Sequence, residues 1–538
     1  MSKVKIILIV FVLAVFSANK INAQVGGEEV DVVVGYNPIL ADAVKVDIQG
    51  EIPKTGSKPD TLSYNVKTDL FKVAYRPLKV NPIALPKDKP EELENVYAKA
   101  GFGTQITPLL EAYINSNRSD KYNFGIYGKY ISSQGALENQ DFSDLDVGAS
   151  AKFFFNKKIA VPLNIFYNND VLHYYGYNNE DTVLSFTSKE VKQRFDYFGF
   201  NTGFENIVEN TVKIDYKIRG GFTRINDINK YNEINPFVSA FVETQLENGH
   251  ETGGTLLIDH YQYNGPNDYK NTIIGVKPHY NIINDDWSVK AAFEFNIDDN
   301  GEFKPLPDAE FSKDLIGDKL VFIVGADSYL KRNSFKNLTD ENPFLADTIV
   351  FENSVFYEYY GGIRGSTYGN FSFNLKGYIK DIKDMVFFVN DSNDLKRFDI
   401  IYDDAKITGV NVELSYFTAG KLRILGAVNA FAFSDLSIDK PLHTPTLDWT
   451  FSTDYHFNKK LQAGFDVFGA NKSYALLPGN TIETIDGTVD INFAATYKYS
   501  KYFNLFVQVN NIMGTKYERF YNYPGYGFQA LGGLSFSF

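Results

Sequence analysis

The chain has 538 residues, a net charge of −13 and a pI near 5.1, and no stretch is basic enough to follow a phosphate backbone, which excludes nucleic-acid binding. Cysteine is absent, which excludes disulfides, thiolate metal sites and cysteine nucleophiles. The 36 Tyr and 46 Phe are typical of the aromatic girdles of a membrane β-barrel. A mean hydropathy of −0.24 excludes only a helical membrane protein, because a barrel alternates lipid-facing and lumen-facing residues.

The first residues have the organisation of a secretory signal peptide. Lys3 and Lys5 precede an uninterrupted apolar run over residues 6–16, and the polar stretch SANKINA follows it. The run is too short to span a bilayer, so we expect a signal peptide over residues 1–23 with cleavage after Ala23. A buried amphipathic helix is the alternative. No later apolar run approaches the roughly 20 residues of a spanning helix.

Residues 24–95 are predicted to form an N-terminal arm without a core of its own. The segment opens with GGEEVDVVVGYNPIL and becomes rich in proline towards its end, at Pro77, Pro82, Pro86 and Pro90. Proline removes a backbone donor and favours extended, poorly paired chain. So short a segment buries too little apolar surface for an autonomous core. We therefore expect an arm that lies in the periplasm or inside a barrel lumen.

From residue 96 to residue 538, short turns alternate with long polar segments. Tight turns are predicted at 115–121, 156–158, 205–210, 247–249, 284–286, 316–319, 365–370, 418–421, 458–460 and 499–502. Longer segments are predicted at 136–143, 177–192, 331–354, 385–404, 436–445, 475–487 and 514–525. This alternation of short and long connections is typical of an outer-membrane β-barrel with tight periplasmic turns and long extracellular loops. It predicts an all-β fold with about 22 antiparallel transmembrane strands, within a range of about 18 to 22.

The closing stretch, YNYPGYGFQALGGLSFSF, carries the clearest strand pattern. Its even-numbered residues from Phe528 to Phe538 form a mainly apolar face, whereas Ser535 and Ser537 lie on a mostly small or polar face. We expect Leu534 and Phe536 to face lipid and the two serines to face the lumen or the periplasmic mouth. The alternative is a secreted soluble β-protein whose apolar face points inward.

Several segments resemble the barrel of TonB-dependent outer-membrane receptors, particularly those of Bacteroidota. The resemblance is carried by residues 357–388, 405–417, 443–475 and 503–538, the last reading FNLFVQVNNIMGTKYERFYNYPGYGFQALGGLSFSF. It implies a location in the cell outer membrane, transport of an unidentified solute, and contact with membrane lipid. It also implies that Phe538 and Phe536 form a C-terminal signal read by the barrel assembly machinery.

The arm contains a segment similar to the family's TonB-coupling box, EEVDVVVGY at residues 28–36. Within it, Asp31, Val32, Val33 and Val34 could join a partner sheet as an edge strand through main-chain hydrogen bonds. TonB is the partner that the resemblance implies. The alternative is a short strand resting against the lumen wall.

The arm also departs from the family pattern, because the family's plug domain is about twice its length. A barrel of this width needs its lumen plugged or gated to avoid passing solutes indiscriminately. Three interpretations remain open. The arm is a reduced plug, another protein such as a lipoprotein closes the lumen, or long loops such as 331–354 and 385–404 fold inward.

The sequence shows no catalytic or metal-binding motif. The six histidines have neither an i,i+4 pair nor an HExxH motif, and no G-x-S-x-G or phosphate-binding loop occurs. We therefore expect no cofactor, no metal site and no enzymatic activity. The acidic segments 390–395 and 399–405 could bind calcium through carboxylates, although they lack EF-hand spacing and solvated loops are the alternative.

Two functions follow from these observations. The first is transport of an unidentified solute through a large outer-membrane barrel. The second is a non-transporting, structural or accessory barrel within an envelope assembly or secretion complex. The two differ in whether the arm recruits TonB and whether the reconstituted barrel conducts.

Overall fold

A 22-stranded antiparallel sheet closes on itself to form a barrel, because β1 pairs with both β2 and β24. The computed structural model describes residues 95–538 except 118, 178–183, 208–212, 300, 318, 368–369 and 419. The predicted all-β barrel of about 22 strands is confirmed, and its first strand begins at Val96. The predicted signal peptide and arm lie outside the described residues.

The strands follow one another around the barrel in chain order. They are β1 (Val96–Gly103), β2 (Thr107–Asn115), β3 (Tyr122–Ser133), β4 (Phe142–Phe155), β5 (Ile159–His173), β6 (Lys192–Asn206), β7 (Ile214–Asn226), β8 (Asn232–Gln245), β9 (Glu251–Asn264), β10 (Tyr269–Ile283), β11 (Trp287–Ile297), β12 (Phe303–Asp314), β13 (Val321–Lys331), β14 (Ser354–Thr367), β15 (Phe371–Asn390), β16 (Phe398–Thr418), β17 (Leu422–Ser434), β18 (Leu447–His456), β19 (Leu461–Ala470), β22 (Thr488–Lys498), β23 (Phe503–Asn510) and β24 (Gln529–Ser537). A separate hairpin pairs β20 (Ser473–Leu477) with β21 (Thr481–Ile485). Two short helices, α2 (Ser188–Val191) and α3 (Phe335–Glu341), lie in loops. In the described chain neither helix is long and apolar enough to cross a membrane.

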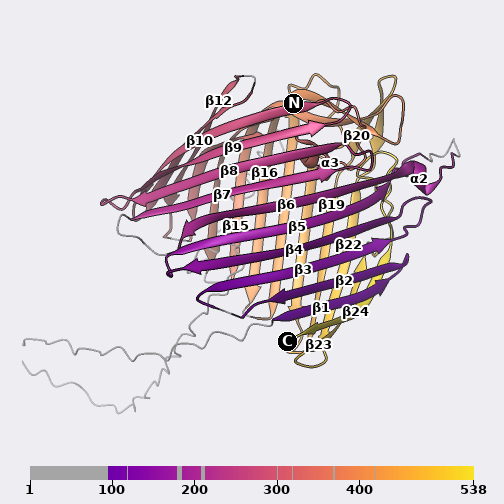
Figure 1. The fold of residues 1–538 in the computed structure, drawn as a ribbon, viewed down its shortest axis with the longest axis horizontal. Coiled ribbons are helices and arrows are strands. Elements are labelled where there is room, and N and C mark those ends of the chain that lie inside the picture. Colours follow the sequence, from indigo (N-terminus) through magenta and orange to yellow (C-terminus); the bar gives the residue numbers. More distant parts are fainter. Residues whose placement is uncertain are drawn as a thin grey trace, which may run out of the picture. The chain divides into compact units, whose positions relative to one another are not determined.

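The connections differ between the two ends of the barrel (Figure 1). All ten predicted tight turns join consecutive strands at one end, which we call the turn end. The longer connections, with α2, α3 and the β20–β21 hairpin, gather at the other end, which we call the loop end (Figure 1).

The predicted long loop at 385–404 is wrong. β15 and β16 continue as a hairpin through this segment, pairing Met385 with Asp403 and Asn390 with Phe398, and only residues 391–397 connect them. A register shift between Ile382 and Met385 lets the hairpin extend beyond the regular ladder. The segment's many Asp and Asn residues indicated a loop, but the apolar residues between them sustain the pairing.

The barrel exterior is an apolar band. In β24, Leu534 and Phe536 are 45 % and 43 % exposed, whereas Ser535 and Ser537 are 6 % and 5 % exposed. The predicted register of the closing strand is therefore confirmed. The other strands present large exposed apolar residues in the same way, including Leu110, Ile126, Val147, Ile165, Phe200, Val238, Leu256, Ile274, Phe293, Val324, Ile379, Leu414, Val428, Phe451 and Phe465. Such a surface is stable in contact with lipid, whereas its exposure to water would cost free energy.

Aromatic side chains border this band at both ends, and lysines concentrate at one of them. Exposed aromatic residues include Tyr122, Phe155, Phe457, Tyr499 and Tyr502 at the turn end, and Phe102, Phe303 and Phe528 at the loop end. Described turn residues include Lys121, Lys157, Lys158, Lys213, Lys319, Lys421, Lys459, Lys460 and Lys501, against the acidic residues Asp120, Glu247, Asp285 and Asp286. The turn end is thus a basic rim beneath an aromatic girdle.

Candidate functional site: the loop-side mouth of the barrel

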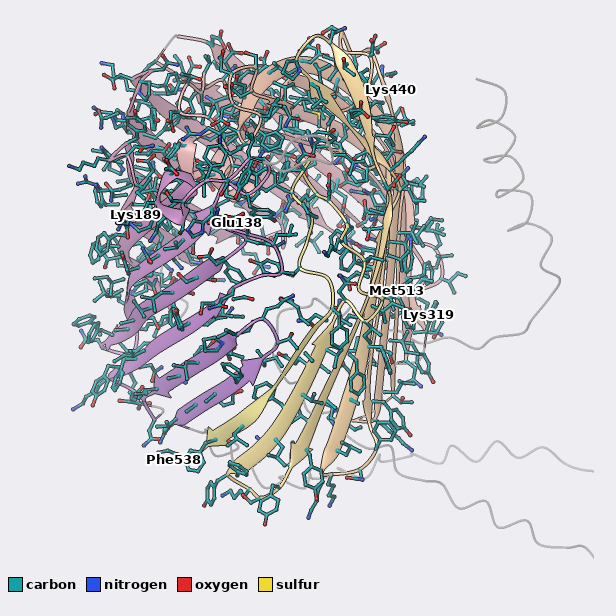
Figure 2. The ribbon with its side chains drawn as sticks, turned by 90° about the vertical axis from the view of Figure 1, so that its right-hand side faces the viewer. Glu138, Lys189, Lys319, Lys440, Met513 and Phe538 are labelled. Atoms are coloured by element: carbon teal, nitrogen blue, oxygen red, sulfur yellow. The ribbon has the colours of Figure 1, made fainter. Side chains whose placement is uncertain are left out.

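The loop end holds the largest apolar core of the described chain. We call it the mouth cluster. Its buried members come from strands and loops far apart in the sequence, and are Phe195, Ile225, Tyr263, Phe335, Leu338, Leu345, Ile349, Phe351, Phe388, Phe398, Phe520 and Tyr523. Partly buried neighbours such as Tyr175, Tyr197 and Phe344 pack around it. Figure 2 shows the loop residues Glu138, Lys189, Lys440 and Met513 distributed around this end of the barrel.

The β13–β14 loop enters the cluster through α3. Ser334 caps the helix, because its Oγ accepts a hydrogen bond from the Asn337 amide at 3.3 Å. The carboxylate of Glu233, on β8, accepts a second bond from the Phe335 amide at 2.6 Å. The helix then buries Phe335 and Leu338 in the mouth cluster. A seven-residue helix is too short to be stable alone, so these tertiary contacts hold it.

Phe398 occupies the centre of the cluster and is fully buried. Its ring centroid lies 5.5 Å from that of Phe520, 5.9 Å from that of Tyr523 and 5.4 Å from that of His443. Tyr523 in turn stacks on Phe344 at 3.7 Å with an interplanar angle of 23°. These rings join the β13–β14, β17–β18 and β23–β24 loops into one packed unit.

The cluster connects opposite walls of the barrel. β6, which supplies Phe195, is the sixth strand of the closed sheet, and β15, which supplies Phe388, is the fifteenth. They are nine positions apart in a 22-stranded ring, which is close to half of the circumference. Packing that joins the two must therefore extend across the mouth rather than along one wall.

Polar contacts tie the same loops together. Arg397 in the β15–β16 loop pairs with Asp347 in the β13–β14 loop, with Nη1 and Oδ2 2.7 Å apart. The guanidinium of Arg332 pairs with the carboxylate of Asp259 on the β9 wall. Further bonds run from Gln140 Nε2 to the Pro524 carbonyl (2.9 Å), from the Tyr175 hydroxyl to the same carbonyl (3.2 Å), and from Asn267 Nδ2 to the Thr348 carbonyl (3.1 Å). Neighbouring loops are therefore fixed to one another as well as to the wall.

Burial shifts the pKa values of several mouth residues. Desolvation lowers the pKa of His443 to about 4, against a smaller opposing contribution from the hydrogen bond that its Nδ1 donates to the Phe388 carbonyl at 3.1 Å. Its imidazole is therefore neutral at pH 7. Burial raises the pKa of Asp227 to about 6 and that of the Tyr175 hydroxyl to about 12. Desolvation is the largest cause in all three cases, as expected for a dry, packed closure.

Below the mouth, the inner wall carries paired charges. Lys376 and Lys380 both contact Glu358, at 2.7 Å and 2.8 Å, and lie on the face of β15 opposite the outward Ile379. Similar inward groups include Lys152 with Glu205, Arg219 with Glu205, Lys277 with Asp308, His279 with Glu243, and Lys99 with Glu111. A wall of charged groups suits a hydrated lumen.

The site residues predicted from the sequence have different outcomes. Asp31, Val32, Val33 and Val34 lie outside the described residues. Phe536 and Phe538 lie on the exposed face of the turn end with ring centroids 5.4 Å apart, and the Phe538 carbonyl accepts hydrogen bonds from the amides of Asn95 and Val96. Their role as an assembly signal remains a prediction.

The mouth cluster was not predicted from the sequence. A signal was present in YERFYNYPGY at residues 517–526, since so many aromatic rings in one loop are unusual for a solvated segment. The acidic 391–397 connection is a turn, in which the Asp391 carboxylate accepts bonds from the amides of Asn393 and Asp394. Among the described residues no group of three His, Cys, Asp or Glu side chains could hold a metal ion.

Solved structures share this fold, although no family model and no curated protein matches the sequence. The pyoverdine outer membrane receptor FpvA from Pseudomonas aeruginosa superposes with a TM-score of 0.66 at 14 % identity, over 84 % of this chain and 79 % of that one. The FrpB iron transporter from Neisseria meningitidis superposes with a TM-score of 0.65 at 12 % identity, over 84 % and 82 %. A variant of the ferric enterobactin receptor PfeA from Pseudomonas aeruginosa gives 0.64 at 10 % identity, over 84 % and 81 %. The chain therefore has the barrel fold of outer-membrane receptors.

Proposed function

We propose that this protein transports a solute across the outer membrane and that the mouth cluster is the closed state of its loop-side gate. The main support is that residues from opposite walls and from several loops pack in one aromatic core at the mouth, and that the inner wall below this core is charged. A barrel with only a structural role has no need of both a hydrated lumen and a dedicated closure. The solved structures with this fold include an iron transporter, a ferric enterobactin receptor and a pyoverdine receptor, which supports the same class of function.

In this proposal the gate opens because the mouth loops are less stable than the barrel wall. Most buried members of the mouth cluster lie in the β13–β14 and β23–β24 loops, whereas the barrel wall is held by continuous ladders of backbone hydrogen bonds. Elements with few ladder bonds open locally at a lower free energy than the barrel unfolds. A solute that binds the open arrangement better than the closed one would shift the loops outward, by no more than its difference in affinity for the two.

We further propose that Asp31, Val32, Val33 and Val34 couple the barrel to TonB by edge-strand addition. The support is the sequence pattern of this segment alone. Val33→Pro should abolish energised uptake and leave the barrel folded, because proline removes a backbone donor without touching the barrel's own ladder. Uptake at the wild-type rate in Val33→Pro cells would reject the coupling role.

The gate can be tested by locking it. The chain has no cysteine, so Asp347→Cys and Arg397→Cys together create a unique pair on two loops whose native side chains touch. A short bismaleimide should join these two neighbouring loops in the closed arrangement. Cells expressing the pair should take up radiolabelled iron from a panel of ferric siderophores, and lose that uptake on cross-linking. Each single-cysteine variant, treated with the same reagent, is the matched control.

The structural alternative predicts a different outcome. An accessory barrel would give no solute uptake in either state, and would copurify stoichiometrically with other envelope proteins under mild detergent. Uptake that persists after complete cross-linking would instead show that solute bypasses the mouth cluster, and the gate assignment would be wrong.

A further inference from the structure

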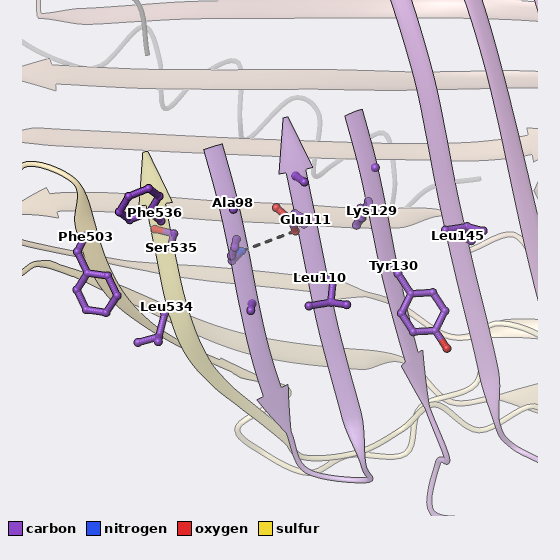
Figure 3. Close-up of a pocket in the computed structure, with 14 residues that line it drawn as sticks. Ala98, Leu110, Glu111, Lys129, Tyr130, Leu145, Phe503, Leu534, Ser535 and Phe536 are labelled. Atoms are coloured by element: carbon purple, nitrogen blue, oxygen red, sulfur yellow. Dashed lines mark ion pairs between the residues drawn. The ribbon is translucent and has the colours of Figure 1, made fainter. Parts of the chain in front are cut away.

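The barrel exterior is hollowed across the strands where the sheet closes. The groove has a volume of about 510 Å³, and Figure 3 shows its residues on β23, β24 and β1–β4. Register places Phe536, Ala98, Ala112 and Gly128 in one row across four adjacent strands. Three consecutive small residues in that row form the floor.

Large apolar side chains bound this floor. Phe503 and Phe536 border it on the β23–β24 side, and Leu110 and Tyr130 rise on strands that also supply the floor (Figure 3). Strands lie about 4.8 Å apart, so three small residues side by side leave a hollow roughly 10 to 15 Å wide. A Cβ atom added at Gly128 would have the Val147 Cγ1 atom as its nearest neighbour, at 3.6 Å. A methyl group would therefore fit at Gly128 in ordinary van der Waals contact, and the hollow itself lies beyond it.

The end of the groove nearest the turn end of the barrel faces the basic rim. The β2–β3 turn carries Lys121, the β4–β5 turn carries Lys157 and Lys158, and the β22–β23 turn carries Lys501. Among the described residues of these three turns Asp120 is the single acidic side chain, and it pairs with Lys157 at 2.7 Å. An apolar hollow thus leads to a set of cationic groups at the depth expected for lipid phosphates.

From this arrangement we infer that the groove is a binding site for one anionic phospholipid of the leaflet at the turn end. An acyl chain lies in the hollow over Ala98, Ala112 and Gly128, and the headgroup phosphate contacts the rim lysines. Charge complementarity selects the occupant, because a purely apolar partner would gain nothing from the rim. The groove is also continuous with the apolar band that lipid covers elsewhere. The inference rests on the proposed membrane location, and not on transport.

The experiment is native mass spectrometry of the full chain in detergent, titrated with phosphatidylglycerol and, separately, with zwitterionic phosphatidylcholine. Wild-type protein should retain one phosphatidylglycerol with an affinity at least tenfold above that for phosphatidylcholine. Ala112→Leu and Gly128→Leu should each weaken phosphatidylglycerol binding at least tenfold by filling the hollow. Ala291→Leu, at an exposed outward position on β11, is the matched control and should bind as wild type does.

Charge variants test the headgroup. Lys121→Gln with Lys158→Gln should reduce phosphatidylglycerol binding to the phosphatidylcholine level, whereas Lys421→Gln with Lys460→Gln, on distant turns, should not. Heat-dependent gel mobility verifies that each barrel is folded, so a folding failure is distinguishable from lost binding. Equal binding of lipid by the groove variants and wild type would overturn the site, as would equal affinity for the two lipids. A dimer abolished by Ala112→Leu would identify a second copy as the occupant and also overturn the proposal.

Discussion

The turn end and the loop end of this barrel are stabilised by different interactions. At the turn end, connections are short and local: Asn156 and Lys157 have φ of 51° and 54°, and the Lys158 amide donates to the Phe155 carbonyl at 3.0 Å. Two central residues with positive φ form the tight turn whose twist matches a hairpin. At the loop end, residues 332–353 and 511–528 are ordered by packing on aromatic rings from distant strands.

This difference separates folding from gating. Tight turns fix the register of neighbouring strands, so the wall can form hairpin by hairpin without the mouth. The mouth cluster is built from contacts of long sequence separation, and these can be lost while the ladder remains. A change in the mouth should therefore alter the state of the gate, whereas a change in the wall should alter assembly of the whole barrel.

The largest effect should come from Phe398→Ala. Phe398 is fully buried, so truncation leaves a cavity at the centre of the cluster and should destabilise the closed mouth by about 3 to 5 kcal/mol. Hydrogen exchange should accelerate in the 332–353 and 511–528 loops and stay unchanged in the strands. Phe451→Ala, which removes a ring 42 % exposed on the outer face, is the control and should leave both loops protected. Accelerated exchange throughout the wall would contradict independent gating.

Acid should weaken the mouth through His443. Its folded pKa of about 4 lies below the usual 6.5, so the closed state binds its proton less tightly than the open state does. His443 therefore contributes full stability above pH 6.5, and this contribution falls as pH decreases towards 4, by about 3 kcal/mol in all. Loop hydrogen exchange, corrected for its intrinsic pH dependence, should reveal more opening at pH 5 than at pH 7.

The carboxylate of Asp227 has the opposite effect on the pH dependence of the mouth, so its contribution must be separated from that of His443. Its folded pKa of about 6 is raised, so protonation between pH 6 and 4 favours the folded state. His443→Gln removes the titrating ring and should abolish the acid-induced opening at residues 511–528. Asp227→Asn should leave that opening in place or enlarge it. If the loops of His443→Gln open in acid as much as those of wild type, His443 is not the responsible group.

The wall could be predicted from the sequence because its determinants are local. Alternation in β24 identified Leu534 and Phe536 as outward residues, and the turn residues placed all ten hairpin connections. Each of these features is decided within about ten residues, by a two-residue period or by a turn conformation. The wrong loop at 385–404 shows the limit. The polar composition of this segment indicated a loop. Its strand pairing depends on β15 and β16 lying side by side beyond a register shift, which local composition does not reveal.

The mouth cluster could not be predicted because its members are joined only by the closed ring. Phe195, Phe398 and Phe520 are separated by more than a hundred residues each, and no periodicity relates them. Closure of 22 strands brings β6 and β15 to opposite sides of one opening, and loop length then decides what meets there. The aromatic content of residues 517–526 indicates burial, but not the partner.

A charge on the wall should affect assembly rather than gating. Leu534→Arg places a cation on the lipid-facing side, where the cost is about 2 to 4 kcal/mol at the midplane and smaller towards the edges. Leu534 lies three residues from the end of β24, so we expect about 2 kcal/mol. Ser535 is a poor control, because it is buried opposite Lys99. Gln508→Arg, on the inward face of β23, should fold normally, and refolding into liposomes would measure the difference. Equal losses would contradict the register.

The smallest effect should come from an ion pair at the turn end. Asp120 and Lys157 are 2.7 Å apart, yet their side chains are 78 % and 77 % exposed, so solvent screens the pair. Asp120→Asn should leave the thermal unfolding midpoint of the barrel unchanged. Asp347→Asn breaks a pair whose side chains are only 28 % and 25 % exposed. It should accelerate hydrogen exchange in the β13–β14 loop, because Arg397 then keeps only its longer contact with Asp394, at 3.6 Å, within its own loop. If Asp120→Asn destabilised its end of the barrel more than Asp347→Asn destabilised the mouth, the turn end would not consist of simple local turns. The loop end would then not be the end that depends on packing between loops.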